Sequence, residues 1–165
     1  MPFGYHGGYL RIDLSTHRAK PAASLDSLKA GAAWVPLAET LLRQYIGGSG
    51  LGVRLLLDEG TAHLDALDPR APLIFAFSPL VGSPLTTSAK FAVVSKSPLT
   101  DRINDALASS GFAVAGKSAG CDAIVIVGRA AELSVLVIDD GEVRVESAAE
   151  CAGMTCQVTD AHLRS

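Results

Sequence analysis

The stretch AKFAVVSKSPLTDRINDALASSGF, residues 89–112, decides the fold class because it joins a buried strand to a polar segment. Its apolar run at Phe91–Val94 predicts a strand over Ala89–Ser97. Pro98 cannot continue a central strand, so the chain is expected to turn there. The residues beyond the turn mix small, polar and apolar types, which predicts a polar loop followed by a helix at Gly111–Ser118.

Further strand patterns lie on both sides of this stretch. Alternating apolar and polar residues over Gly8–Ala23 predict a strand, a turn and a second, weaker strand. Continuous apolar runs predict buried strands at Leu73–Phe77 and Cys121–Ala130. Two alternating runs around a central Asp-Asp-Gly predict a hairpin over Leu133–Ala148.

Helical patterns are fewer and come early in the chain. Ser24–Gly48 predicts two helices, the second beginning at Pro36, and Gly48–Gly60 predicts a glycine-rich loop followed by a short apolar helix. Runs of strands with few helices between them favour an α+β fold of antiparallel β-sheets over a doubly wound sheet. We expect one domain over residues 1–150 and a weakly patterned tail over residues 151–165.

The composition excludes several function classes. The hydrophobic content of 48% and charged content of 19% are typical of a folded globular chain rather than a disordered one. The net charge is −3 and no basic stripe is present, so we expect no nucleic-acid partner. No apolar run is long enough to predict a membrane span, and the first residues lack a signal-peptide pattern. The expected location is therefore the cytoplasm.

The cysteines predict neither a disulfide framework nor a metal site. Cys121, Cys151 and Cys156 are an odd number, and Cys151 and Cys156 have a C-x4-C spacing with His162 nearby. Zinc sites usually show two tighter pairs, so ordinary thiols are the favoured interpretation and no metal is expected.

Two lysines on the predicted strand are the first candidates for chemistry. Lys90 and Lys96 are six residues apart, so their side chains share a face of the strand, and Ser88 would share it as well. If that face looks into a cavity, the ammonium and hydroxyl groups form an anion or enolate site. Lysines also commonly guard exposed strand edges, and the pattern supports both interpretations equally.

The glycine-rich GGSGLG, Gly47–Gly52, and Asp122 each leave two interpretations open. GGSGLG could hold an anion at a helix N-terminus, but it is neither G-x-G-x-x-G nor a P-loop, and a flexible connection between helices is favoured. Asp122 precedes a buried strand, where it could be a buried carboxylate or the cap of a turn.

Five segments of the chain together form a specific pattern. In order, they are YLRIDLST (Tyr9–Thr16), YIGGSGLGVRLLLDE (Tyr45–Glu59), PLIFAFSPLVGS (Pro72–Ser83), KFAVVSKSPLTD (Lys90–Asp101) and AGCDAIVIVGRA (Ala119–Ala130). This pattern resembles the N-terminal domain of the tungsten-containing aldehyde:ferredoxin oxidoreductase family. The resemblance implies an α+β base of antiparallel sheets on which a bis-pterin tungsten cofactor sits. It also implies that iron–sulfur ligands and most of the aldehyde pocket belong to later domains.

The chain departs from this family at the cofactor positions. Ser49 and Lys90 stand where the family usually has arginine, and Leu107–Ser110 replaces an Asn-Ser-Gly-Gly. Ser78–Gly82 reads Ser-Pro-Leu-Val-Gly in place of Gly-Pro-Leu-Thr-Gly. Serine and lysine do not reproduce the bidentate fork of arginine, and serine restricts the close backbone approach that glycine allows. We therefore expect no cofactor.

These departures predict a repurposed stand-alone domain that binds a small, largely apolar molecule, as a pure binder or as the catalyst of a cofactor-free cyclisation, isomerisation or elimination. The alternatives are an accessory or split subunit of a tungsten or molybdenum pterin aldehyde oxidoreductase and a structural partner. A homodimer is expected, because the missing family repeat would leave apolar surface exposed. Candidate catalytic residues are Lys96 and Lys90, and candidate substrate-binding residues are Ser88, Ser97, Ser109, Ser110 and Ser49.

Overall fold

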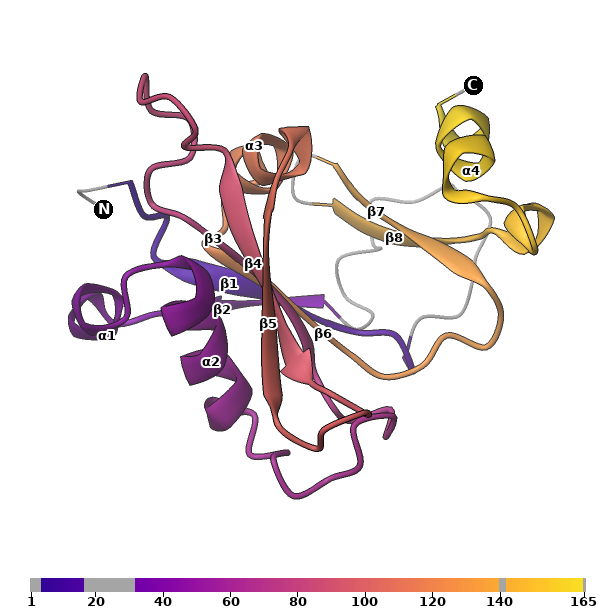
Figure 1. Ribbon diagram of the computed structural model, residues 1–165, viewed down its shortest axis with the longest axis horizontal. Helices are drawn as coiled ribbons and strands as arrows, with labels where there is room; N and C mark the ends of the chain where they lie inside the picture. The colour runs from indigo at the N-terminus through magenta and orange to yellow at the C-terminus, as the bar shows by residue number, and fades with distance from the viewer. Residues whose placement is uncertain (1–3, 17–31, 140–141, 165) are drawn as a thin grey trace.

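The computed structural model describes residues 4–16, 32–139 and 142–164. Its main element is a six-stranded sheet in the order β2-β1-β6-β3-β4-β5, beside which a separate two-stranded hairpin, β7-β8, lies toward the side of α4 (Figure 1). The strands are β1 (Gly8–Asp13), β2 (Ala32–Pro36), β3 (Leu73–Phe77), β4 (Lys90–Lys96), β5 (Ile103–Ser109), β6 (Ala123–Val127), β7 (Ser134–Asp139) and β8 (Glu142–Ser147).

The sheet is predominantly antiparallel. Only β1 and β6 run parallel among the described strands, and every other pair of neighbours is antiparallel. Four α-helices and a short 3-10 turn accompany these strands in the described part of the chain, so the α+β class is confirmed. The helices are α1 (Glu39–Gln44), α2 (Gly48–Asp58), α3 (Gly111–Ser118) and α4 (Cys156–Leu163), and the 3-10 turn is Ala149–Cys151.

The central strands of the six-stranded sheet are buried on both faces. On one face, Ile74 and Ala76 of β3 pack with Leu51 and Leu55 of α2. On the other face, the alternate residues of β3 pack against α3 and the hairpin, where Phe77 belongs to the same cluster as Ala113, Val143 and Leu136. This two-sided burial explains why β3 and β6 appear in the sequence as continuous apolar runs.

The predicted polar loop after Pro98 is wrong, because Ile103–Ser109 forms β5. This strand pairs antiparallel with β4 over its whole length, from Lys90↔Ser109 to Lys96↔Ile103. All seven of its residues are exposed, so neither face selects apolar side chains and the alternation that marks a strand is absent. The helix predicted at Gly111–Ser118 is confirmed as α3.

The predicted helices before Gly48 are partly wrong. Ala32–Pro36 forms strand β2, which pairs with β1 at the edge of the sheet, where the missing N–H of Pro36 is tolerated. The second helix begins at Glu39 rather than at Pro36. The expected helix start at Ser24, like the weaker strand after the first turn, falls in residues 17–31, outside the described residues.

The glycine-rich GGSGLG is not a separate loop, since α2 begins at Gly48. Gly47, its N-cap, has a φ of 54°, and a Cβ there would lie 2.5 Å from Cδ of Pro79. Glycine is therefore required at this close contact. Beyond Ala148, the chain forms the 3-10 turn and α4 in a segment where the sequence pattern predicted no regular element.

None of the helices in the described part of the chain combines the length and the apolar character needed to cross a membrane.

Candidate functional site

Two of the predicted site residues meet at one end of β4. Lys90 and Ser109 are directly opposite each other across β4 and β5, and Nζ of Lys90 donates a hydrogen bond to Oγ of Ser109 at 2.9 Å. Both side chains are on the face that carries α2, because the alternate residue Val94 contacts Gly52 of that helix. This pair places an exposed cation and a hydroxyl at the start of β4.

A second polar contact joins the N-terminus of α2 to β5. The hydroxyl of Ser49 donates a hydrogen bond to Oδ2 of Asp105 at 2.6 Å. Asp105 pairs with Val94, so its side chain is on the same sheet face as that of Ser109. Four residues of extended strand separate Asp105 and Ser109, a distance of about 13 Å.

Leu107 lies between these two polar contacts on the same sheet face, and its side chain is 69% exposed. We call this surface the β5 strip and define it as Ser49, Lys90, Asp105, Leu107 and Ser109. It combines one cation, one carboxylate, two hydroxyls and an exposed apolar side chain. Such a strip can hold the polar end of a small molecule beside an apolar contact.

Lys96 and Ser97 are not part of the β5 strip. They lie at the other end of β4, about 20 Å from Lys90 along the strand. Nζ of Lys96 donates to the carbonyl oxygens of Ala62 and Leu64 at 3.2 and 2.7 Å and forms an ion pair with Asp101 at 2.6 Å. These contacts hold a loop against the β4–β5 turn, which is a structural use of the ammonium group.

The remaining predicted serines make local contacts. Oγ of Ser97 accepts hydrogen bonds from the backbone N–H groups of Leu99 and Thr100, which fixes the turn after β4. Ser110 is the N-cap of α3, and its Oγ accepts from the N–H of Phe112 at 3.2 Å. Ser88 lies before β4, and its hydroxyl donates to the carbonyl of Ser83 at 3.5 Å.

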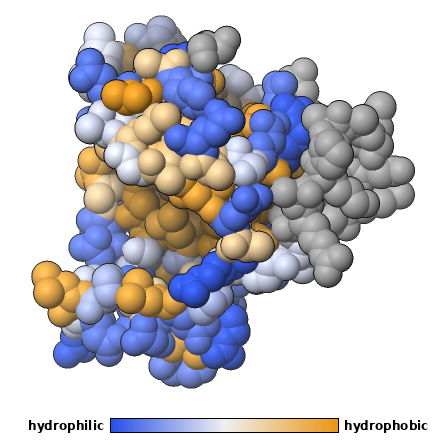
Figure 2. Space-filling model, turned by 90° about the vertical axis from the view of Figure 1, so that its right-hand side faces the viewer, coloured by the Kyte–Doolittle hydropathy of each residue, from blue (hydrophilic) through white to orange (hydrophobic). Residues whose placement is uncertain are grey.

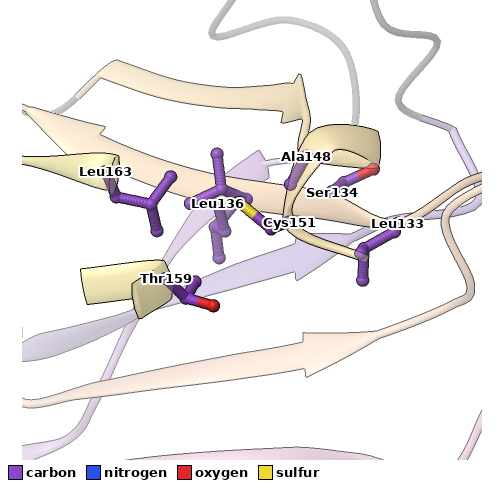
Figure 3. A pocket seen from close by; sticks show the side chains of 8 residues that line it. Leu133, Ser134, Leu136, Ala148, Cys151, Thr159 and Leu163 are labelled. Carbon is purple, nitrogen blue, oxygen red and sulfur yellow. The ribbon is translucent and has the colours of Figure 1, made fainter. Parts of the chain in front are cut away.

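A pocket that the sequence did not predict lies between the β7–β8 hairpin and α4. Its volume is about 350 Å³, and mostly apolar side chains line it (Figure 3). Figure 2 shows apolar side chains gathered around a hollow on the side of the molecule that carries this hairpin and helix. This pocket could not be predicted from the sequence, because the tail that supplies part of its lining lacks a clear pattern. The lining residues are Leu133, Ser134, Val135, Leu136, Ala148, Cys151, Thr159 and Leu163.

Asp122 is a fully buried carboxylate, which resolves the two interpretations that the sequence left open. It accepts hydrogen bonds from the backbone N–H groups of His6, Gly7 and Gly8, the shortest at 2.7 Å. Its charge partner is the buried Lys117 of α3, whose Nζ lies 2.5 Å from Oδ1. Sequence reasoning missed Lys117, although a lysine five residues before an aspartate in an apolar segment could have indicated a pair.

No group of three histidine, cysteine or acidic side chains among the described residues is close enough to hold a metal ion. His162 instead approaches Glu150 at 3.5 Å. Burial raises the pKa of the Cys121 thiol to about 11, with a smaller contribution from the negative charge of Asp122. Cys121 is therefore not an activated thiol.

The residues of the β5 strip are chemically unsuited to hold the metallopterin that the family resemblance implies. A pterin cofactor carries phosphate groups, yet the carboxylate of Asp105 lies on the strip and would repel them. The hydroxyl of Ser49 is already directed at this carboxylate, and the single cation, Lys90, is directed at Ser109. No bidentate guanidinium is present among the five residues of the strip.

The chain is similar in sequence to aldehyde ferredoxin oxidoreductases. A family model described as aldehyde ferredoxin oxidoreductase, N-terminal domain, matches residues 9–165. The chain is 33% identical over 162 residues to the tungsten-containing aldehyde ferredoxin oxidoreductase of Pyrococcus furiosus, which covers 98% of this chain and 25% of that protein. The corresponding protein of Thermococcus kodakarensis is 31% identical, again over 98% of this chain and 25% of its own length.

Two further similarities widen the range of relatives. The aliphatic sulfonate oxidoreductase, WOR-like subunit, of Pyrococcus furiosus is 30% identical over 92% of this chain and 22% of its own length. Among solved structures, the active site complex BamBC of benzoyl coenzyme A reductase, in complex with 1,5-dienoyl-CoA, matches with a TM-score of 0.85 and 25% identity. The match covers 99% of this chain and 23% of that one. The chain thus spans about a quarter of the length of these relatives.

Proposed function

Because this chain belongs to the aldehyde ferredoxin oxidoreductase N-terminal domain family, we propose that it is an oxidoreductase-derived module that binds a small, largely apolar molecule on the β5 strip. The ligand would direct an anionic or hydrogen-bond-accepting group at Lys90 and place an apolar body over Leu107. The observation that carries this proposal is the exposed Lys90–Ser109 pair beside the exposed Leu107.

The charge pattern of the strip supports a ligand with one acidic group rather than several. Lys90 is the single cation of the strip, and it is about 13 Å along the sheet from the carboxylate of Asp105. A monocarboxylate at Lys90 would gain a charge-assisted hydrogen bond and remain distant from Asp105. A ligand with an extended set of phosphates would reach this carboxylate and be repelled.

The exposure of this site supports ligand binding rather than catalysis. Lys90 is exposed, so the described residues neither exclude water from it nor preorganise a reacting group beside it. The other candidate catalytic residue, Lys96, already has three protein partners. A cofactor-free cyclisation, isomerisation or elimination would therefore require the ligand itself to close the strip from solvent.

A titration followed by nuclear magnetic resonance tests the proposal. Sodium hexanoate and sodium benzoate would be added to 15N-labelled protein, and amide shifts would be mapped on the chain. We expect the shifts to cluster at Lys90, Leu107 and Ser109 and to weaken several-fold in Lys90→Gln. The matched control is Arg129→Gln, which removes an exposed cation elsewhere. Shifts confined to the hairpin pocket, or no shifts at millimolar ligand, would contradict the proposal.

A second candidate function is an accessory or split subunit of a pterin-dependent oxidoreductase whose other domains come from another chain. The observation that favours it is the 30% identity to a protein described as a subunit, the aliphatic sulfonate oxidoreductase, WOR-like subunit, of Pyrococcus furiosus. Metal analysis and pterin fluorescence of the purified protein separate the two candidates. Stoichiometric tungsten or molybdenum with a pterin signal would favour the accessory subunit, and protein lacking both while binding hexanoate would favour the module.

The homodimer expected from the apolar composition belongs to the same proposal. A second copy would lie beside exposed apolar side chains such as Ile103 of β5 and leave Leu107 open to the ligand.

A further inference from the structure

β5 is an edge strand, and it lacks the proline and lysine residues that commonly prevent other strands from pairing with such an edge. β5 is the last strand of the sheet, and no described strand pairs with its other edge. It lies at the front of the molecule in Figure 1, and all seven residues of Ile103–Ser109 are exposed. It contains neither proline nor lysine, and its only charge is Asp105. The opposite edge strand, β2, carries Pro36, which is a common way of blocking edge pairing.

The direction of the backbone groups alternates along β5, so every second residue directs its N–H and C=O away from β4. The N–H of Ser78 donates to the carbonyl of Lys90 at 3.2 Å, so the backbone groups of Lys90 face β3. Along β4 this direction alternates, so the backbone groups of Phe91 face β5, and those of its partner Ala108 face β4. By the same alternation, the backbone N–H and C=O groups that face outward belong to Ile103, Asp105, Leu107 and Ser109.

The sequence of β5 is compatible with an antiparallel copy of itself. Pairing centred on Ala106 uses the whole strand and sets Asp105 opposite Leu107 of the second copy, and Ile103 opposite Ser109. Each residue whose backbone groups face outward then lies opposite another such residue of the second copy, as a hydrogen-bonded antiparallel pair requires. Pairing centred on Asp105 would instead set two carboxylates against each other, which is unfavourable. Charge and length therefore both select the register centred on Ala106.

We propose that two copies of this chain associate through their β5 edges, in antiparallel register about Ala106, to form one continuous sheet. Both α2 helices then lie on the same face of that sheet, since the two-fold axis runs perpendicular to it. The two β5 strips become neighbours across the axis, so the partner copy extends the surface beside Leu107. This inference concerns the association of the chain and stands independently of the ligand proposed above.

Charge variants of one residue test the register as well as the association. In the proposed dimer, Leu107→Asp sets a carboxylate opposite Asp105 of the second copy, and the two-fold axis repeats this repulsion. Leu107→Lys sets an ammonium there and forms an opposite-charge pair instead. We expect the dimer dissociation constant of Leu107→Asp to exceed that of Leu107→Lys by on the order of tenfold or more. Sedimentation velocity over a concentration series measures both constants.

Two further variants keep the test decisive. Leu107→Pro removes an outward-facing N–H and leaves the bonds to β4 in place, so it should give a folded monomer with an unchanged circular dichroism spectrum. Leu163→Asp makes the same apolar-to-acid change on the α4 side, where Leu163 is 50% exposed, and should leave the dimer intact. A monomeric wild type, equal dissociation constants for the two charge variants, or a dimer lost in Leu163→Asp but retained in Leu107→Pro would overturn the proposal.

Discussion

Lys117 and Asp122 form an ion pair in the interior of the protein, with Nζ 2.5 Å from Oδ1 and neither side chain more than 9% exposed. The same carboxylate accepts hydrogen bonds from the backbone N–H groups at the start of β1, and Tyr5 lies with its ring 5.5 Å from the ammonium. A single buried pair thus fixes α3, the start of β6 and the N-terminal segment to one another.

Removing one charge of this pair should be strongly destabilising. Asp122→Asn leaves the Lys117 ammonium buried without a counter-charge, and breaking such a pair typically costs about 3 to 5 kcal/mol. We expect the free energy of unfolding, measured by urea denaturation, to fall by this amount.

The matched control is the double variant Lys117→Met/Asp122→Asn, which removes both charges and keeps the side chains similar in volume. It should be more stable than Asp122→Asn alone, because no unpaired charge remains in the interior. A double variant as unstable as the sum of two damaging single changes would show that the charges do not act as a pair.

Features that depend on local pattern could be predicted from the sequence, and features that depend on pairing could not. β3 and β6 are buried on both faces, so their apolar runs identify them, and α3 follows from the small and apolar residues of Gly111–Ser118. β5 and β2 are edge strands whose form depends on a neighbouring strand that the local sequence does not reveal.

The candidate site could be predicted only in part for the same reason. Strand parity placed Lys90 and Lys96 on one face correctly, but the distance along the strand puts them at opposite ends. The partner of Lys90, Ser109, was predicted as a site residue, whereas Asp105 was not, because its role depends on β5 passing beneath Ser49.

Gly116 should tolerate no side chain, because a Cβ there would overlap the ring of Phe77 in the core. Gly116→Ala forces the helix or the ring to move, and overpacking of this kind typically costs about 1 to 3 kcal/mol. The control in the same helix is Gly111→Ala, where a Cβ meets nothing within 4 Å and higher helix propensity should be neutral or stabilising by up to about 1 kcal/mol. Thermal unfolding of both variants measures the contrast, and equal melting temperatures would contradict it.

Lys96 should contribute to local stability more than Lys90 does. Lys96→Met removes donors to the carbonyls of Ala62 and Leu64 and the ion pair with Asp101, so we expect a loss of about 1 to 2 kcal/mol. Amide hydrogen exchange around these two carbonyls should become faster. Lys90→Met, at an exposed position, should change stability by less than about 0.5 kcal/mol. If Lys90→Met were the more damaging change, the structural role assigned to Lys96 would be wrong.

Cys121 should make the protein less stable as the solution becomes alkaline. Its pKa is raised from 9.0 to about 11, first by burial and then by the charge of Asp122, while Lys117 acts in the opposite direction. Because the folded state disfavours the thiolate, the thiol's contribution to the free energy of unfolding is fully present below about pH 9. This contribution is lost as the pH rises toward 11. The loss is at most about 2 to 3 kcal/mol.

Urea denaturation at several pH values between 8 and 11 measures this effect, and the slope of unfolding free energy against pH should be shallower in Cys121→Ala. Some slope should remain, since burial also raises the pKa values of Tyr5 and Tyr9. Alkylation at pH 8 gives an independent check: the exposed Cys156 should react first, and Cys121 only on unfolding. Rapid modification of Cys121 in the folded protein, or identical slopes for the two proteins, would contradict the assignment of a buried, neutral thiol.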